Sequence, residues 1–319
     1  MTTDEVSKRA LVTGADGFVG RKLCAYLAGR GWDVLGCDLR KPSGPGPGVT
    51  CDVTDPEGLS RLMDGCGPLT HVFHLAALSF VPDAIRNPSR TFEVNLQGTI
   101  YLTQALRKHA PNARLIYIGS AAAYGQPRSL PMTETHPINP KNPYAISKAA
   151  ADHYCGFLHE AGALDVVRVR PFNHAGAGQP DVFVLSSFAR QVAGIESGRL
   201  PPVLKVGNLD ARRDFSHVAD VIRAYEQIAL HGEPGEAYNI CSGQAPRIQD
   251  AVDKLLELSH VAIRVEPDPS RLRTVDVSEV RGSHEKLKAR TGWQPGLSFE
   301  RVLLDLLNHW RLQEREAAG

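Results

Sequence analysis

A glycine-rich turn that directly follows the first predicted strand is the feature that most constrains the fold. Residues 9–13 read RALVT and form a short apolar strand, and residues 14–20 continue as GADGFVG and open a helix. Gly14 permits the tight turn, Gly17 lets the backbone approach a pyrophosphate, and Gly20 lets the helix lie close to the sheet. The N-terminus of that helix then faces the phosphates. The pattern predicts a dinucleotide-binding site at the start of a parallel sheet.

Strands and helices alternate after this turn, which predicts a doubly wound parallel α/β sheet with right-handed crossovers. The further strands are expected at residues 32–37, 49–51, 71–75, 114–119 and 165–170, and the helices at 56–65, 88–110 and 143–160. From about Gln179 the regular alternation of strands and helices ends. Short elements connected by proline-rich segments predict a smaller mixed lobe there. We therefore expect a dinucleotide-binding Rossmann domain over 1–178 and a mainly substrate-binding lobe over 179–319, with some segments returning to the core.

Within the second lobe, the sequence predicts two short strands and four helices. The strands are expected at 203–206 and 237–240, and the helices at 181–196, 217–230, 247–258 and 299–311.

A carboxylate at the end of the second strand bears on the choice of cofactor. Asp38 lies 18 residues beyond Gly20, where a carboxylate accepts hydrogen bonds from the adenosine ribose and repels a 2′-phosphate. Arg40 supports the alternative, because a guanidinium attracts that phosphate. We expect NAD(P)H, with a preference for NADH. The other candidate cofactor-binding residues are Phe18, Val19, Leu39, Asp52, Val53, Leu75, Ala76, Ala77, Asn95, Tyr144, Lys148 and Pro171.

A tyrosine and a lysine four residues apart form the candidate catalytic pair. Residues 142–148 read NPYAISK and place Tyr144 and Lys148 on one helix face, about one turn apart. A positive charge beside the phenol lowers its pKa from about 10 towards the working range of a general acid. Ser120 follows the fifth strand, at the sheet edge where ligands bind. Asn95 sits among apolar neighbours and is either a structural amide or a polar link to this site.

Composition excludes several classes of protein. With 319 residues and 42% hydrophobic content the chain can bury a full core, and a formal charge of +1 gives no electrostatic case for nucleic acid or an anionic membrane. Residues 1–9 lack the apolar core of a signal peptide, and nowhere do 18 apolar residues run together, so we expect a cytoplasmic protein. Six cysteines and 12 histidines show no metal-ligand spacing, so we expect buried reduced thiols and no metal.

Taken in order along the chain, these residues resemble the extended short-chain dehydrogenase/reductase family, in its nucleotide-sugar branch. The resemblance covers nearly the whole chain and rests on Gly14, Gly17, Gly20, Ser120, Tyr144 and Lys148. The chain is more narrowly similar to GDP-4-keto-6-deoxy-D-mannose reductases and GDP-mannose 4,6-dehydratases. That similarity rests on RPFNH at 170–174, RDF at 213–215, NICSGQ at 239–244, DPSRLR at 268–273 and TGW at 291–293.

The resemblance implies an NAD(P)H-dependent reductase acting on the C4 ketone of a nucleotide-linked 4-keto-6-deoxyhexose, with GDP as the favoured nucleotide. It implies that Ser120, Tyr144 and Lys148 carry catalysis. It further implies that Asn173, Arg213 and Arg273 contact the sugar nucleotide, the two arginines at its diphosphate. A guanidinium suits that role because it binds phosphate oxygens in a bidentate manner.

Three alternatives remain at this stage. A nucleotide-sugar 4-epimerase is the stronger one, because it needs no further acid–base pair. A 4,6-dehydratase needs an Asp and Glu pair after the fifth strand, where residues 121–123 are alanines, and the proline-containing loop gives no reason to place Glu134 or His136 there. A non-catalytic dinucleotide sensor has no need of the three catalytic side chains together.

Two predicted helices, 88–110 and 143–160, carry more apolar and small residues than one sheet face can cover. These residues are Ile100, Leu102, Leu106, Ala149, Ala150, Tyr154, Phe157 and Leu158. In the resembled family the equivalent helices form a four-helix dimer seam, so we expect a homodimer. The alternative is that the apolar stripes belong to the core alone.

Overall fold

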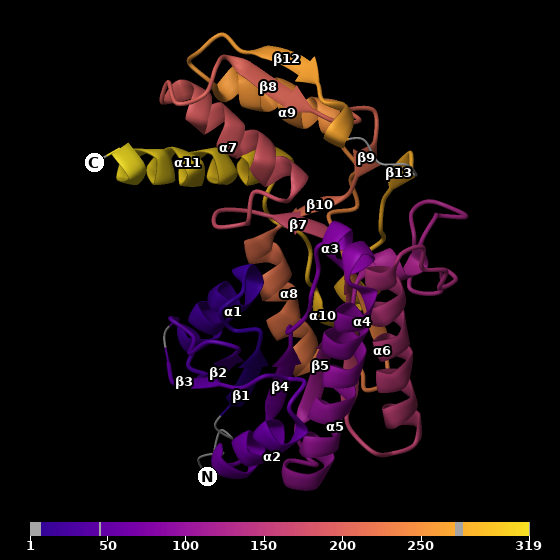
Figure 1. The fold of residues 1–319 in the computed structure, drawn as a ribbon. Coiled ribbons are helices and arrows are strands. Elements are labelled where there is room, and N and C mark those ends of the chain that lie inside the picture. The colour runs from indigo at the N-terminus through magenta and orange to yellow at the C-terminus, as the bar shows by residue number, and fades with distance from the viewer. Residues whose placement is uncertain (1–7, 45, 272–276, 319) are drawn as a thin grey trace.

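A seven-stranded parallel sheet forms the centre of the computed structural model, which describes residues 8–44, 46–271 and 277–318 (Figure 1). The strand order is β11-β6-β5-β4-β1-β2-β3, and all neighbouring strands pair in parallel. The strands are β1 (Arg9–Thr13), β2 (Asp33–Asp38), β3 (Gly48–Thr50), β4 (His71–His74), β5 (Arg114–Ile118), β6 (Val166–Pro171) and β11 (Ala237–Ile240). The chain winds outward from β1 in both directions, which confirms the predicted α/β class.

Helices cover both faces of this sheet. One face packs against α1 (Phe18–Ala28) and α8 (Val218–His231), and the other packs against α2 (Pro56–Gly65), α5 (Gly98–His109) and α6 (Pro143–Glu160). Successive strand residues point to opposite faces, so Val12 lies in the first core and Leu11 in the second. All six cysteines are buried and free, as predicted.

The helix predicted over 88–110 is present, but it contains a π turn that the sequence did not predict. The structure has α3 (Val81–Arg86), which the sequence analysis missed, then α4 (Pro88–Phe92), a π-helical turn (Glu93–Gln97) and α5. Periodicity alone does not separate a π turn from a regular α-helix, because one extra residue in one turn leaves the apolar pattern nearly unchanged. The π turn carries Asn95, and such turns are frequent at functional sites.

The remaining elements form a second, smaller group above the carboxyl edge of the sheet (Figure 1). Its core lies between three helices and a short parallel strand pair, namely α7 (Val184–Glu196), α9 (Ile248–Leu258), α11 (Phe299–Ala318), β8 (Val203–Val206) and β12 (Arg264–Pro267). Two shorter parallel pairs and one helix join it to the sheet, namely β7 (Asn173–Ala175) with β10 (Phe215–His217), β9 (Arg212–Arg213) with β13 (Glu279–Val280), and α10 (Glu285–Thr291).

Elements from beyond the predicted boundary at residue 178 also belong to the central sheet and its covering layer. Strand β11 pairs with β6 at the sheet edge, and α8 packs against the face shared with α1. The boundary predicted at residue 178 stays a prediction. Among the residues that the structure describes, no helix is long and apolar enough to cross a membrane. The cytoplasmic location is a separate prediction that this finding does not test.

Close backbone approaches hold the glycine-rich turn against the sheet. Gly14 has a φ of 72°, and a Cβ atom there would lie 2.8 Å from the backbone nitrogen of Ala76 after β4. A Cβ atom at Gly20 would overlap the carbonyl oxygen of Gly14. Both positions therefore require glycine, one for its left-handed backbone and both for lack of space.

Replacing Gly20 with alanine is expected to destabilise the protein by roughly 1–3 kcal/mol or more, because the added methyl group must displace backbone rather than a side chain. Thermal denaturation measures the effect. Gly65→Ala is the matched control, since no atom lies within 4 Å of its Cβ position and the residue ends a helix. That variant should be as stable as the wild type or slightly more so. Equal melting temperatures for the two variants would contradict the packing argument.

Candidate active site

The predicted catalytic residues meet at the carboxyl edge of the central sheet. Ser120 follows β5, and Tyr144 and Lys148 lie on the first two turns of α6. Asn142 caps that helix, because its Oδ1 atom accepts a hydrogen bond of 2.9 Å from the backbone nitrogen of Ala145. Each catalytic side chain is therefore carried by the end of a regular element.

Ser120 lies beside Tyr144 and influences its phenol. The Ser120 Oγ atom accepts a bond of 3.1 Å from the backbone nitrogen of Ala122. Burial raises the pKa of Tyr144, and the Ser120 side chain lowers it in part. The prediction that Lys148 lowers this pKa stays a prediction. In this structure the Lys148 ammonium group is directed to the carbonyl oxygen of Ile118.

Lys148 is buried, with 4% of its surface exposed. Its Nζ atom donates a hydrogen bond of 2.6 Å to the Ile118 carbonyl and lies 5.1 Å from the centroid of the Tyr117 ring. Burial lowers the pKa of Lys148 to about 8, although the acidic groups of Cys155 and Asp152 raise it in part. The lysine therefore loses its proton far more readily than a solvated lysine does.

A buried ion cluster that the sequence analysis missed lies one turn beyond Lys148. The Asp152 carboxylate accepts hydrogen bonds from Arg168 at 3.2 Å and from Arg170 at 2.8 and 3.0 Å. Arg170 also donates to the Tyr124 hydroxyl at 3.1 Å, and that hydroxyl donates to Asn239 on β11 at 2.7 Å. A signal was present in the sequence, because two arginines spaced by two residues in a strand share one sheet face.

Asn95 is both a structural amide and a link to the catalytic helix. Its Oδ1 atom accepts a bond of 2.8 Å from the backbone nitrogen of Leu78, and its Nδ2 atom donates to the Leu78 carbonyl and to the Ser147 hydroxyl at 3.0 Å. Ser147 in turn donates to the carbonyl oxygen of Tyr144 at 2.8 Å. The amide thus ties the loop after β4 to α6. Its predicted contact with a cofactor stays a prediction.

The residues around the glycine-rich turn fit the adenosine and diphosphate ends of a dinucleotide. The first turn of α1 contains no acidic residue, and the absence of side chains at Gly14 and Gly20 lets the turn pack closely against the backbone around it. Asp38 accepts hydrogen bonds from the backbone nitrogens of Asp16 at 2.8 Å and Leu39 at 2.7 Å, which hold its carboxylate beside the turn.

The remaining candidate cofactor residues lie at the ends of the same strands. Arg40 is exposed, and Asp52 accepts two bonds of 2.8 Å from the backbone and hydroxyl groups of Thr54. Phe18 stacks on His174 with ring centroids 6.5 Å apart. Leu75, Ala76 and Ala77 follow β4, Val53 is buried near the end of β3, and Pro171 ends β6.

The predicted substrate residues are only partly described. Asn173 is exposed on β7, which pairs with β10 so that Asn173 lies opposite Phe215, two residues from Arg213. Arg213 is half-buried and donates a bond of 2.8 Å to the Arg212 carbonyl. Arg273 lies outside the described residues.

A second buried carboxylate organises the loops near Arg213, and the sequence analysis noted it only as part of a motif. Asp214 accepts bonds of 2.7 and 2.6 Å from the backbone and hydroxyl of Ser242, and further bonds from the backbone nitrogens of Gly243 and Gly282. Burial raises its pKa to about 6, and these four donors oppose that rise. Asp214 thus joins its own segment, which follows β9, to the loop of Ser242 and Gly243 and to the loop of Gly282.

The loop after β5 offers no free acid–base pair. Residues Ala121–Tyr124 form a 3₁₀ turn. Of the two groups considered from the sequence, Glu134 accepts a bond of 2.8 Å from the backbone nitrogen of Asn239, and His136 accepts one of 3.1 Å from that of Arg128. Both side chains hold the loop in place. Among the described residues, no group of three or more His, Cys, Asp and Glu side chains could hold a metal ion.

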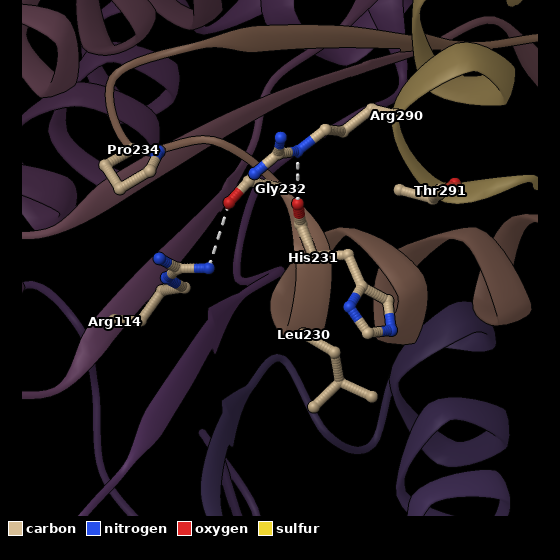
Figure 2. Close-up of a pocket in the computed structure, with 7 residues that line it drawn as sticks. All are labelled: Arg114, Leu230, His231, Gly232, Pro234, Arg290 and Thr291. Carbon is tan, nitrogen blue, oxygen red and sulfur yellow. Dashed lines mark hydrogen bonds between the residues drawn. The ribbon is translucent and has the colours of Figure 1, made fainter.

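A cavity of about 510 Å³ lies at the opposite edge of the sheet from these residues, at the start of β5 and the end of α8 (Figure 2). Its two guanidinium groups are bonded to the protein backbone, because Arg114 donates to the Gly232 carbonyl at 3.0 Å and Arg290 donates to the His231 carbonyl at 2.7 Å. The cavity is therefore distinct from the catalytic edge, and none of the candidate catalytic residues lines it.

Comparison with known proteins gives consistent relatives over nearly the whole chain. The sequence model of the family described as GDP-mannose 4,6 dehydratase matches residues 11–306. The chain is 38% identical to a GDP-6-deoxy-D-mannose reductase from Pseudomonas aeruginosa, over 98% of this chain and 100% of that protein. It is 30% identical to a UDP-glucose 4-epimerase from Streptomyces lividans, over 94% of this chain and 95% of the other.

Solved structures agree with these sequence relatives. The structure of RMD from Pseudomonas aeruginosa complexed with NADPH matches with a TM-score of 0.87 and 37% identity, covering 96% of this chain and 100% of that one. A Thermus thermophilus UDP-glucose 4-epimerase in complex with NAD matches with a TM-score of 0.84 and 30% identity, covering 95% and 99%.

Proposed function

Because the chain belongs to the GDP-mannose 4,6-dehydratase family of extended short-chain dehydrogenases/reductases, we propose that it is an NAD(P)H-dependent reductase of a nucleotide-linked 4-keto-6-deoxyhexose. The proposed substrate is GDP-4-keto-6-deoxy-D-mannose, and the product is GDP-D-rhamnose or its C4 epimer. The similarity to the reductase from Pseudomonas aeruginosa supports this choice of substrate.

In the proposed mechanism, the nicotinamide cofactor supplies the hydride to C4 of the sugar. Tyr144 donates the proton to the C4 oxygen, so that the ketone becomes a hydroxyl group. Ser120 donates a hydrogen bond to the oxygen as negative charge develops there. Lys148 binds the cofactor ribose, and its positive charge stabilises the phenolate that Tyr144 becomes. Asn173, Arg213 and Arg273 bind the sugar nucleotide.

The observation that carries this proposal is the placement of the Ser120 side chain beside the Tyr144 phenol, with the buried Lys148 four residues on along α6. A reductase needs these groups and no more, whereas a dehydratase must also remove the C5 proton and protonate the departing C6 hydroxyl. The side chains of residues 121–123 are methyl groups, which do not transfer protons. The nearby Glu134 and His136 are bonded to the backbone of their own loop and of β11.

We expect GDP-4-keto-6-deoxymannose to oxidise added NADH or NADPH stoichiometrically, and GDP-mannose with NAD or NADP to give no 4-keto product. Tyr144→Phe should lower turnover by roughly 10²–10⁴-fold while cofactor binding is retained, because only the proton donor is lost. Tyr154→Phe, on the same helix, is the matched control and should keep wild-type turnover. The cofactor absorbance measures the rates, and NMR of the product identifies which face of C4 receives the hydride.

A 4-keto-6-deoxy sugar formed from GDP-mannose would show that the protein is a dehydratase. Interconversion of C4 epimers without net consumption of cofactor would show an epimerase, since that enzyme returns the hydride within one catalytic cycle. Near-wild-type turnover by Tyr144→Phe would refute the assigned proton donor whichever reaction is found.

We propose that NADH is the preferred cofactor. The Asp38 carboxylate is held at the end of β2 by two backbone donors, and a 2′-phosphate brought beside it would be repelled. Asp16, on the same turn, adds a second carboxylate, which is paired with Arg21 at 3.0 Å. Related structures contain either NADPH or NAD, so the preference depends on this chain's own residues.

We expect a higher kcat/KM with NADH than with NADPH. Asp38→Asn should raise kcat/KM for NADPH by roughly tenfold, because it removes one charge of the same sign near the 2′-phosphate. Arg40→Ala is the control and should leave kcat/KM for NADH unchanged. A wild-type preference for NADPH that Arg40→Ala abolishes would reverse the assignment.

We also propose a homodimer that forms through α6 and the adjoining helices. Four of the eight residues that suggested this seam are instead core residues, namely Leu102, Leu106, Ala149 and Leu158. The support now comes from exposed apolar residues on the opposite side of α6. Ile146 and Phe157 are exposed, Ala150 and Tyr154 are half-buried, and their spacing places all four on one helix face.

Light scattering at micromolar concentration should give twice the mass of one chain. Phe157→Asp should halve that mass, because it places a charge in the proposed seam; the Phe157 side chain is 58% exposed in one chain, so the fold should persist. Leu312→Asp on α11 is the control, since Leu312 is similarly exposed at 52% but lies outside the proposed seam. A wild-type monomer would contradict the proposal.

A further inference from the structure

Tyr117 contacts Lys148 at both ends of that residue. Its hydroxyl group donates a hydrogen bond of 3.1 Å to the Lys148 carbonyl oxygen, and its ring centroid lies 5.1 Å from the Lys148 Nζ atom. Tyr117 comes from β5 and is fully buried between the sheet and α6. The two contacts fix both the helix turn that carries the lysine and the direction of its side chain.

The ring contact matters because the ammonium group has little water to bind. An ammonium group has three N–H donors, and one of those on Lys148 is directed to the Ile118 carbonyl at 2.6 Å. The face of an aromatic ring carries partial negative charge and attracts a cation within about 6 Å, most strongly where water is excluded. The Tyr117 ring therefore offsets part of the cost of burying the charge.

None of the other groups around Lys148 takes over the role of the ring in stabilising the buried positive charge. On its own helix the lysine is influenced by Cys155 and Asp152, and the charge of Asp152 is shared with Arg168 and Arg170 from β6. From β4, His74 contributes no charge near neutral pH, because burial and Lys148 lower its pKa to about 3. Cys155 is likewise neutral, since burial raises the pKa of its thiol.

We propose that Tyr117 is a positioning residue for the reduction, and that its ring face keeps Lys148 positively charged and aimed at the catalytic edge. The inference rests on the proposed function, because a positive charge is needed there when Tyr144 gives up its proton. Activity should then fall as the pH rises through the pKa of Lys148. Removing the Tyr117 ring favours the neutral amine of Lys148, so the loss of activity should begin at lower pH.

The test compares Tyr117→Leu with Tyr117→Phe in pH profiles of kcat, with thermal denaturation of each variant. Tyr117→Leu should move the alkaline limb down by about one pH unit and lower kcat at pH 8 by roughly fivefold. Tyr117→Phe keeps the ring and should keep the limb of the wild type. An unmoved limb in Tyr117→Leu, or an equal shift in Tyr117→Phe, would overturn the proposal. An upward shift would also overturn it, since that would show that water solvates the charge better than the ring does.

A second measurement is independent of both turnover and cavity formation. The ¹³Cε signal of Lys148, assigned by its loss in Lys148→Met, is titrated with phenylalanine or pentafluorophenylalanine at position 117. Fluorination removes the negative face but keeps the shape, so the pKa of Lys148 should fall by about one unit. Equal pKa values would overturn the role of the ring. If the wild type reduced no 4-keto sugar, the proposed function would fail while this titration still reported on the contact.

Discussion

The catalytic edge depends on the burial of one positive charge, that of Lys148. An ammonium group without water is costly, and its pKa near 8 reflects that cost. The surrounding structure limits the cost with a backbone carbonyl, an aromatic face and an acidic group one turn away, supplied by Ile118, Tyr117 and Asp152. The burial that lowers the pKa of Lys148 also makes that pKa sensitive to each of these neighbours.

Asp152 in turn requires partners, because an unpaired buried carboxylate is also costly. Arg168 and Arg170 pair with it, and Arg170 continues through Tyr124 to Asn239 on β11. This strand comes from the second half of the chain. Helix α6 is therefore coupled by hydrogen bonds to β11, the strand that leads into the Ser242–Gly243 loop held by Asp214.

Local sequence patterns predicted most of the helices and strands, because caps, prolines and apolar periodicity act over only a few neighbouring residues. The helix limits of Pro56–Gly65 and Pro143–Glu160 follow from a cap and a proline at their starts, and both agree with the structure. The helix predicted over 88–110 is present, but its π turn was not predicted, since that turn is held by Asn95 contacts to Leu78 and Ser147 that no local pattern contains.

By itself, the sequence determined the parallel α/β class and the glycine-rich turn and made Ser120, Tyr144 and Lys148 the candidate catalytic residues, because these inferences depend on residue type and spacing. Only the tertiary structure decided the electrostatics of the site. The Lys148 ammonium group is directed to Ile118 and Tyr117 on β5, and burial raises rather than lowers the pKa of Tyr144. Spacing along one helix places two side chains on one face, but the dielectric around them and the direction of each are set by strands distant in the chain.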